Sequence, residues 1–183
     1  MKYIALLRGI NISGKNKIVM SKLKEVLEKN NYQNVTTHLN SGNVIFETSL
    51  NKKENIAKNI YEIIKYNFKL DIPVFVLNEI ELEDILTNAP DWWGTDNKEI
   101  YDNLIFIMPP TNYQDVYDEV GLPSEGIDKI EVYNNSIYWS FDLKSYRKSN
   151  WWIKTASTNI KDRITIRTAN TMRKILAMCK EKK

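Results

Sequence analysis

The residues best suited to bind an anion come directly after the first apolar run of the chain. This segment reads RGINISGKNK and combines the cations Arg8 and Lys15 with two glycines, Gly9 and Gly14. Glycine allows backbone angles that other residues avoid, and Arg and Lys bind phosphate or carboxylate oxygens. Asn11 adds a side-chain amide. The sequence therefore predicts an anion-binding loop built from these side chains and from backbone amides.

The same loop resembles the phosphate-binding motif of nucleotide hydrolases, but the match is incomplete. That motif reads G-x-x-x-x-G-K-[S/T], and Asn16 stands where its magnesium-binding hydroxyl is required. Residues 18–20 also separate Lys15 from the next predicted helix, so the helix N-terminus would not face a phosphate. A nucleotide hydrolase loop is therefore disfavoured. The simplest alternative is a glycine-containing connection with solvated lysines.

A second polar segment, Asn40-Ser41-Gly42-Asn43, is predicted to form the turn of a hairpin. In a split βαβ arrangement the first and third strands are antiparallel neighbours, so the end of one lies near the start of the other. This topology would bring Arg8 and Asn11 close to the turn. Ser41, Gly42 and Asn43 therefore join the candidate ligand-binding residues.

A third segment, TIRTANT, begins the last predicted helix. Thr168 suits the N-cap of that helix. Arg163 and Arg167 alternate with isoleucines, which predicts that both project from the same face of a strand. Arg167 and Asn170 complete the set of candidate ligand-binding residues. No residue with a defensible geometry for a general base is visible, so no catalytic residue is assigned.

The periodicity of apolar residues predicts an α+β fold of two ferredoxin-like (βαββαβ) subdomains with a linking helix and a C-terminal helix. The first subdomain is predicted over residues 1–78, the linking helix and loop over 79–100, and the second subdomain with the C-terminal helix over 101–183. Capping boxes are predicted at Asn51 with Glu54, Asn78 with Glu81, and Thr111 with Gln114. The halves share an order of elements but no visible residue repeat.

Composition indicates a globular cytoplasmic protein. No apolar run approaches the length of a membrane span, no signal peptide is recognisable, and the single cysteine, Cys179, fits a reducing compartment. The net charge is +3, but it is unevenly distributed. Residues 1–78 and 143–183 carry +6 and +10, whereas residues 79–142 carry −13. This asymmetry favours either an anionic partner or internal charge pairing.

Several chemistries are disfavoured by the residues that carry them. His38 is the single histidine, and it lies in a different predicted element from Cys179. A Cys–His nucleophile, a Ser–His–Asp triad and a zinc site therefore lack their components, and no metal or cofactor is predicted. The tryptophan pairs at 92–93 and 151–152 are more typical of core or interface anchors than of base-stacking platforms.

Five motifs together resemble a widespread bacterial family known only as domain of unknown function 1697. They are LLRGIN (6–11), GKNK (14–17), LNSGN (39–43), PDWWG (90–94), and TIR with NT (165–167 and 170–171). The resemblance implies a single α+β unit with ferredoxin-like subdomains and brings no established activity. This chain departs from the family at Ser13, often a glycine, at His38, often a tyrosine, and at Thr168-Ala169, often Arg-Asn.

Three functions remain open at this stage. The favoured one is binding of a small anionic ligand, with or without catalysis. The second is binding of RNA or DNA by the basic segments, although the aromatic motif usual on such sheets is missing. The third is protein interaction or self-association through the paired tryptophans. No membrane partner is expected, and the oligomeric state is open.

Overall fold

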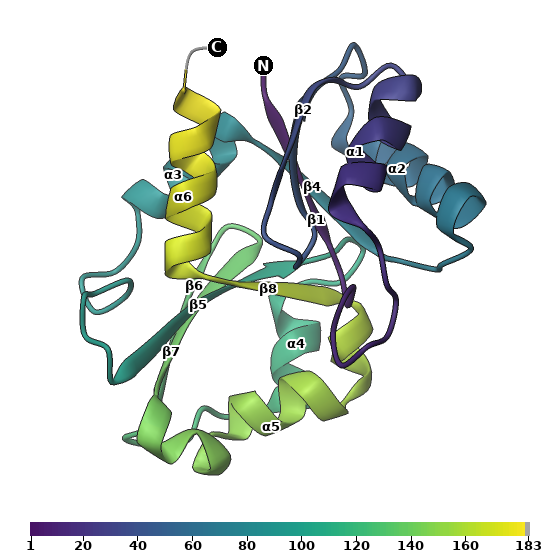
Figure 1. Ribbon diagram of the computed structural model, residues 1–183. Coiled ribbons are helices and arrows are strands. Elements are labelled where there is room, and N and C mark those ends of the chain that lie inside the picture. Colours follow the sequence, from purple (N-terminus) through teal and green to yellow (C-terminus); the bar gives the residue numbers. More distant parts are fainter. Residues whose placement is uncertain (182–183) are drawn as a thin grey trace. The chain divides into compact units, whose positions relative to one another are not determined.

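An uninterrupted apolar run makes β1 (Tyr3–Leu7) a central strand that is buried on both faces. The computed structural model describes residues 1–181 and divides the chain into two compact units. Unit 1 contains Met1–Glu83 and a second segment that begins at Ile175, and unit 2 is Asp84–Lys174. Each unit combines helices with a four-stranded antiparallel sheet, so the chain has an α+β fold (Figure 1).

The sheet of unit 1 has the strand order β2-β3-β1-β4. Its other strands are β2 (Gln33–His38), β3 (Asn43–Glu47) and β4 (Val74–Asn78). Every neighbouring pair is antiparallel, and Leu6 lies opposite Asn43. The predicted neighbourhood of the first and third strands is thereby confirmed. The end of β1 and the start of β3 therefore lie side by side at the same end of the sheet.

Helices α1 (Met20–Lys29) and α2 (Lys53–Phe68) cover one face of this sheet (Figure 1). Helix α2 buries an apolar stripe there, formed at helical spacing by Ile56, Ile60, Ile63 and Ile64. Each fully buried aliphatic side chain of this kind contributes about 1.5–3 kcal/mol to folding. Helix α3 (Glu79–Thr87) follows β4 directly.

The sheet of unit 2 has the order β6-β7-β5-β8, which repeats the arrangement of unit 1. Its strands are β5 (Ile100–Ile107), β6 (Asp128–Tyr133), β7 (Ser136–Asp142) and β8 (Ile164–Thr168). The helical elements of unit 2 are α4 (Tyr113–Val120), η1 (Leu143–Lys148), α5 (Asn150–Ser157) and η2 (Asn159–Asp162). Helix α6 (Ala169–Lys180) begins in unit 2 and ends in the second segment of unit 1. Trp139 and Trp151 lie in the core that this sheet forms with α4 and α5.

Of the three predicted capping boxes, the one at the start of α3 is found at the predicted residues. The capping box of α3 is confirmed: the Glu81 amide donates to Asn78 Oδ1, and the Asn78 amide donates to Glu81 Oε2, both at 2.9 Å. The box predicted at Asn51 is wrong, because α2 begins after Lys52 without a side-chain cap. In α4 the box lies one residue later than predicted and uses Asn112 with Asp115. Competing polar residues one position apart make such starts ambiguous in sequence.

Among residues 1–181, no helix combines the length and the apolar character needed to cross a lipid bilayer.

Candidate functional site

The loop that joins β1 to α1 has an unusual backbone. Gly9, Asn11, Ser13, Gly14 and Asn16 all have φ between +47° and +77°. Left-handed conformations are strained for residues other than glycine, and they cluster at ligand clamps and active sites. Main-chain amides of consecutive turn residues form anion-binding concavities in other proteins. The loop is therefore a candidate for anion binding.

Two asparagine side chains hold this loop. Asn11 Nδ2 donates to the Ile18 carbonyl, and the Ile18 amide donates to Asn11 Oδ1, both at 2.9 Å. Asn16 Nδ2 donates to the Gly9 carbonyl at 2.9 Å. Asparagine tolerates the left-handed region and bonds to nearby backbone, which explains its use here. Asn11 therefore closes the loop on itself.

Asn11 also joins the loop to the turn between β2 and β3. Its Nδ2 donates to the Asn40 carbonyl at 2.8 Å. Within the turn, the buried Asn43 donates from Nδ2 to the His38 carbonyl at 2.9 Å and to Ser41 Oγ at 3.0 Å. The Leu7 amide donates to the Gly42 carbonyl at 2.8 Å. The predicted proximity of the first loop and this turn is confirmed, and Asn11 and Asn43 shape it.

The local electrostatics favour an anion. The amides of Ser13, Gly14 and Asn16 have no acceptor among residues 1–181. Lys15 and Lys17 are exposed, and neither ammonium group pairs with a carboxylate of that part of the chain. The sequence contains no Asp or Glu before Glu25. Positive charge and available donors therefore coincide on this loop.

The candidate residues of the sequence fall into two groups. Arg8, Gly9, Asn11, Lys15, Ser41, Gly42 and Asn43 all lie in unit 1, on the β1–α1 loop and the β2–β3 turn. Arg8 is half-buried, and its amide donates to the Pro73 carbonyl at 3.0 Å. Arg167 and Asn170 lie in unit 2. Their proximity to the first group stays a prediction.

Residues 1–138 match the family described as Protein of unknown function (DUF1697). The chain belongs to this family. A solved structure described as that of the conserved bacterial protein SP0830 from Streptococcus pneumoniae is similar, with 28% sequence identity, 98% of each chain covered and a TM-score of 0.84. Among curated proteins, none matches this chain. The family and its structural relative therefore support the fold and assign no activity.

The DUF1697 motif PDWWG is structural in this protein. Trp93 is buried and donates from Nε1 to the Asn103 carbonyl at 2.7 Å, and its ring contacts Tyr138 at 5.2 Å between centroids. The Arg173 guanidinium lies over the same indole, 5.9 Å from its centroid. A side chain at position 94 would meet Arg173 Nη2 at 2.5 Å, so Gly94 leaves room for it. The sequence interpretation of Trp93 as a core anchor agrees with these contacts.

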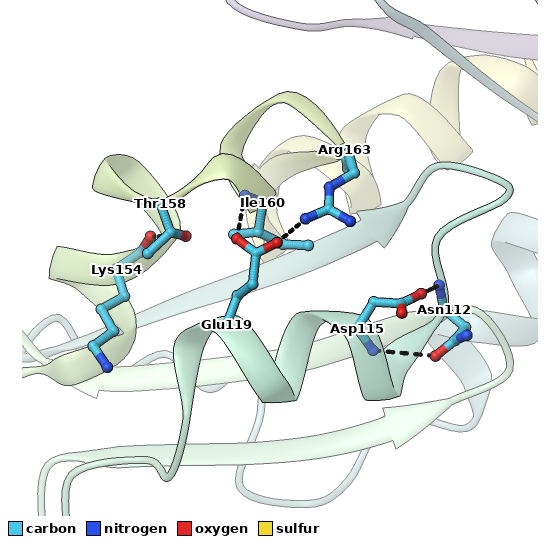
Figure 2. A network of polar contacts seen from close by, with 7 residues as sticks. All are labelled: Asn112, Asp115, Glu119, Lys154, Thr158, Ile160 and Arg163. Carbon is cyan, nitrogen blue, oxygen red and sulfur yellow. Dashed lines mark hydrogen bonds and ion pairs between the residues drawn. The ribbon is translucent and has the colours of Figure 1, made fainter.

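The structure distinguishes two arginines that the sequence treats alike. Strand β8 begins at Ile164, so Arg163 lies outside it, and the prediction that Arg163 and Arg167 project from one strand face is wrong. Arg163 follows η2 and binds Glu119 of α4, whose second carboxylate oxygen accepts from the Ile160 amide at 2.9 Å (Figure 2). Arg167 is nine-tenths buried in β8 and donates from Nη1 to Thr165 Oγ1 at 2.9 Å and to the Ile166 carbonyl at 2.8 Å. The contact drawn for Arg163 therefore ties α4 to η2.

Asn170 is exposed on the first turn of α6 and lines a hollow of about 570 Å³. The wall of this hollow also includes residues 95–98 and the buried Asp102. Asp102 accepts from the Ser140 hydroxyl. Asn170 therefore lies in a polar setting of its own within unit 2.

Sequence reasoning missed two contributors to the loop of unit 1. Asn16 was considered only as a mismatch to the nucleotide motif, yet it bonds across the loop to Gly9. Lys17 was considered only as a solvated lysine, and it adds a second exposed cation beside Lys15. The signal available in the sequence is that Asn11 and Asn16 each follow a glycine by two residues. Within residues 1–181, no group of three or more His, Cys, Asp or Glu side chains gathers to hold a metal ion.

Cys179 is shielded from reagents that attack thiolates. It is 2% exposed and borders a hollow of about 740 Å³ that Lys2 and Ile45 also line. Burial raises the pKa of its thiol to about 11. We expect iodoacetamide at pH 8 to label the native protein about 100-fold more slowly than the urea-unfolded protein. Burial blocks access of the reagent and keeps the thiol protonated.

The raised pKa of Cys179 also sets the sign of a pH effect on stability. The folded protein holds the thiol proton more tightly than the unfolded chain, so this stabilisation is complete below about pH 8.5 and is lost as pH rises toward 11. Cys179→Ser should flatten that part of the stability profile. Equal labelling rates in the folded and unfolded protein would contradict the burial of this thiol.

Proposed function

We propose that this protein binds a small anionic ligand, bearing phosphate or carboxylate, on the loop between β1 and α1. The observation that carries the proposal is the series of left-handed residues from Gly9 to Asn16, held by asparagine side chains, with backbone amides left available. A loop that is ordered before binding loses little entropy on binding. Its exposed lysines supply the charge attraction.

The candidate residues divide into two roles in this proposal. Lys15, with the loop amides, contacts the anion, because its ammonium group is exposed and unpaired among the described residues. Asn11, Gly42 and Asn43 hold the shape of the loop and of the adjoining turn. Arg8 adds positive charge at the end of β1. Arg167 and Asn170 stay in the proposal as residues of unit 2.

The strand order of both sheets supports a finer description of the fold. We infer that each unit is a ferredoxin-like module, since strand–helix–strand–strand–helix–strand with the order 2-3-1-4 occurs twice. A cytoplasmic location also remains part of the proposal, supported by a single cysteine held as a buried thiol.

Thermal unfolding in the presence of candidate anions tests the proposed function. The panel contains inorganic phosphate, pyrophosphate, citrate, sugar phosphates and nucleotides. A ligand present at about 100 times its dissociation constant adds roughly 2.7 kcal/mol, which raises the midpoint by several degrees. For any anion that binds, we expect Lys15→Ala to weaken binding tenfold or more, as loss of a charge-assisted hydrogen bond does.

Lys58→Ala is the matched control for this experiment. Lys58 is exposed on α2 of the same unit, so its substitution removes the same charge from a position outside the loop. Equal affinities of the Lys15 and Lys58 variants would overturn the assignment of the loop. Short RNA and DNA oligomers belong in the same panel, because their binding falls steeply with salt. A response to oligomers alone would favour the nucleic-acid function instead.

A further inference from the structure

Strand β6 is an outer strand of the unit 2 sheet, with β7 on its inner side. It pairs with β7 without irregularity from Asp128 to Tyr133, and a two-residue turn joins the two strands. The residues that flank such a turn form a hydrogen-bonded pair, and the pattern then alternates along the strand. The main-chain groups of Ile130 and Val132 therefore face away from β7.

One hydrogen bond confirms this alternation. The Asp128 amide, two residues before Ile130, donates outside the sheet to the Ser124 carbonyl at 2.9 Å. The amides of Ile130 and Val132 have no such acceptor among residues 1–181. The side chains of Lys129 and Glu131 are exposed, and Val132 is 38% exposed. An open edge with unsatisfied donors and acceptors is a template for another strand.

Strand β2, the outer strand at the corresponding place in the sheet of unit 1, contrasts with this edge. Strand β2 shifts register between Gln33 and Thr36, and Asn34 there has φ +52°. Bulges of this kind disrupt an edge ladder and discourage pairing. Strand β6 carries no such irregularity. Of these two edges, only β6 is regular enough to accept a partner strand.

The sequence of β6, DKIEVY, is complementary to itself when two copies run antiparallel. A two-fold axis beside Ile130 makes Ile130 of the two copies a hydrogen-bonded pair, which is the pairing that the outward main-chain groups require. In that register Lys129 of each copy lies opposite Glu131 of the other. These are non-hydrogen-bonded positions, where the Cα atoms approach to about 4.5 Å and opposite charges attract.

The geometry points to a homodimer in which β6 of two copies pair antiparallel about Ile130, so that one sheet runs through both copies. The bond from the Asp128 amide to Ser124 limits the new ladder to the middle of the strand. The surface buried by one short strand is small, which places the association among weak, transient interfaces. The dimer therefore forms at high protein concentration.

Sedimentation equilibrium of the full chain, from 10 µM to 1 mM in reducing buffer, tests this proposal with a charge swap. Lys129→Glu places like charges opposite each other twice, and Glu131→Lys does the same with the opposite sign. We expect each single variant to raise the dimer dissociation constant at least tenfold. The double variant K129E/E131K restores both attractions and should recover wild-type dimerisation. A wild type that stays monomeric at 1 mM, or a double variant no better than the singles, overturns the proposal.

Removal of a main-chain amide distinguishes strand pairing from attraction between charged side chains alone. Val132→Pro removes an outward amide that no described residue uses, and proline is tolerated at such edge positions. Val132→Ala is the matched control, since it shortens the same side chain and keeps the amide. We expect V132P to raise the dissociation constant at least fivefold above that of V132A. Circular dichroism verifies that both variants fold, and equal dimerisation by the two excludes pairing through β6.

Discussion

Replacing Gly42 by alanine should lower the free energy of unfolding of unit 1 by about 3 kcal/mol. The new Cβ would lie 2.6 Å from Leu7 Cβ and 3.0 Å from Ile10 Cδ1, and Gly42 has φ +82°. The left-handed conformation costs a residue with a Cβ roughly 1–2 kcal/mol, and overpacking a tight site adds about 1–3 kcal/mol. The Leu7 contact involves a Cβ that is fixed to the backbone, so it cannot move aside as the end of a flexible side chain would.

Gly14→Ala is the control that separates these two terms. Gly14 has φ +77°, but a Cβ there would meet no atom within 4 Å. Gly14→Ala should therefore lower the free energy of unfolding only by the cost of the left-handed backbone, about 1 kcal/mol. Urea unfolding followed by far-UV circular dichroism measures both variants, since all five tryptophans lie in unit 2 and do not report on unit 1. Equal losses of unfolding free energy in the two variants would mean that the atoms around Gly42 move aside without cost.

The regular elements were predictable because their signals are local. Continuous apolar runs mark β1 and the second half of β5, and a stripe at helical spacing marks α2. The first half of β5 contains Asp102 and Asn103, so its sequence carries no such signal. The turn at Asn134 and Asn135 joins β6 to β7 as its composition indicates. The meeting of the β1–α1 loop with the β2–β3 turn was also predictable, because strand order alone places the two strand ends together.

Other features depend on contacts that sequence spacing does not encode. Arg163 and Arg167 look equivalent by alternation, yet Arg163 follows a short 3-10 helix and binds Glu119, 44 residues away. Asn11 and Asn43 read as ligand donors, but their amide groups are engaged by main-chain carbonyls. Which polar side chains serve the fold and which remain available to a ligand is decided by tertiary geometry. Among the candidates of unit 1, Lys15 is the exposed cation that this geometry leaves available.

Asp128 was another residue that the sequence did not single out, and its loss should be the most damaging polar change in unit 2. The residue is 8% exposed. Its Oδ1 accepts from the Trp139 indole at 3.1 Å and from Ser149 Oγ at 2.5 Å, and its Oδ2 accepts from the Ser124 amide at 3.0 Å. One carboxylate thus joins β6 and β7 to the start of α5 and to the loop before β6.

Asp128→Ala should lower the free energy of unfolding of unit 2 by about 4 kcal/mol, because each buried donor left without a partner costs roughly 1–3 kcal/mol. Asp128→Asn should lose about half as much, since its amide oxygen still accepts while its NH₂ group faces other donors. Asp118→Ala is the control: Asp118 is exposed on α4 and accepts one bond, from Gln114, so its loss should stay within about 0.5 kcal/mol. Tryptophan fluorescence during urea unfolding follows unit 2 directly. A D128A variant as stable as D118A would show that water replaces the carboxylate, and that the four segments are held together by apolar packing alone.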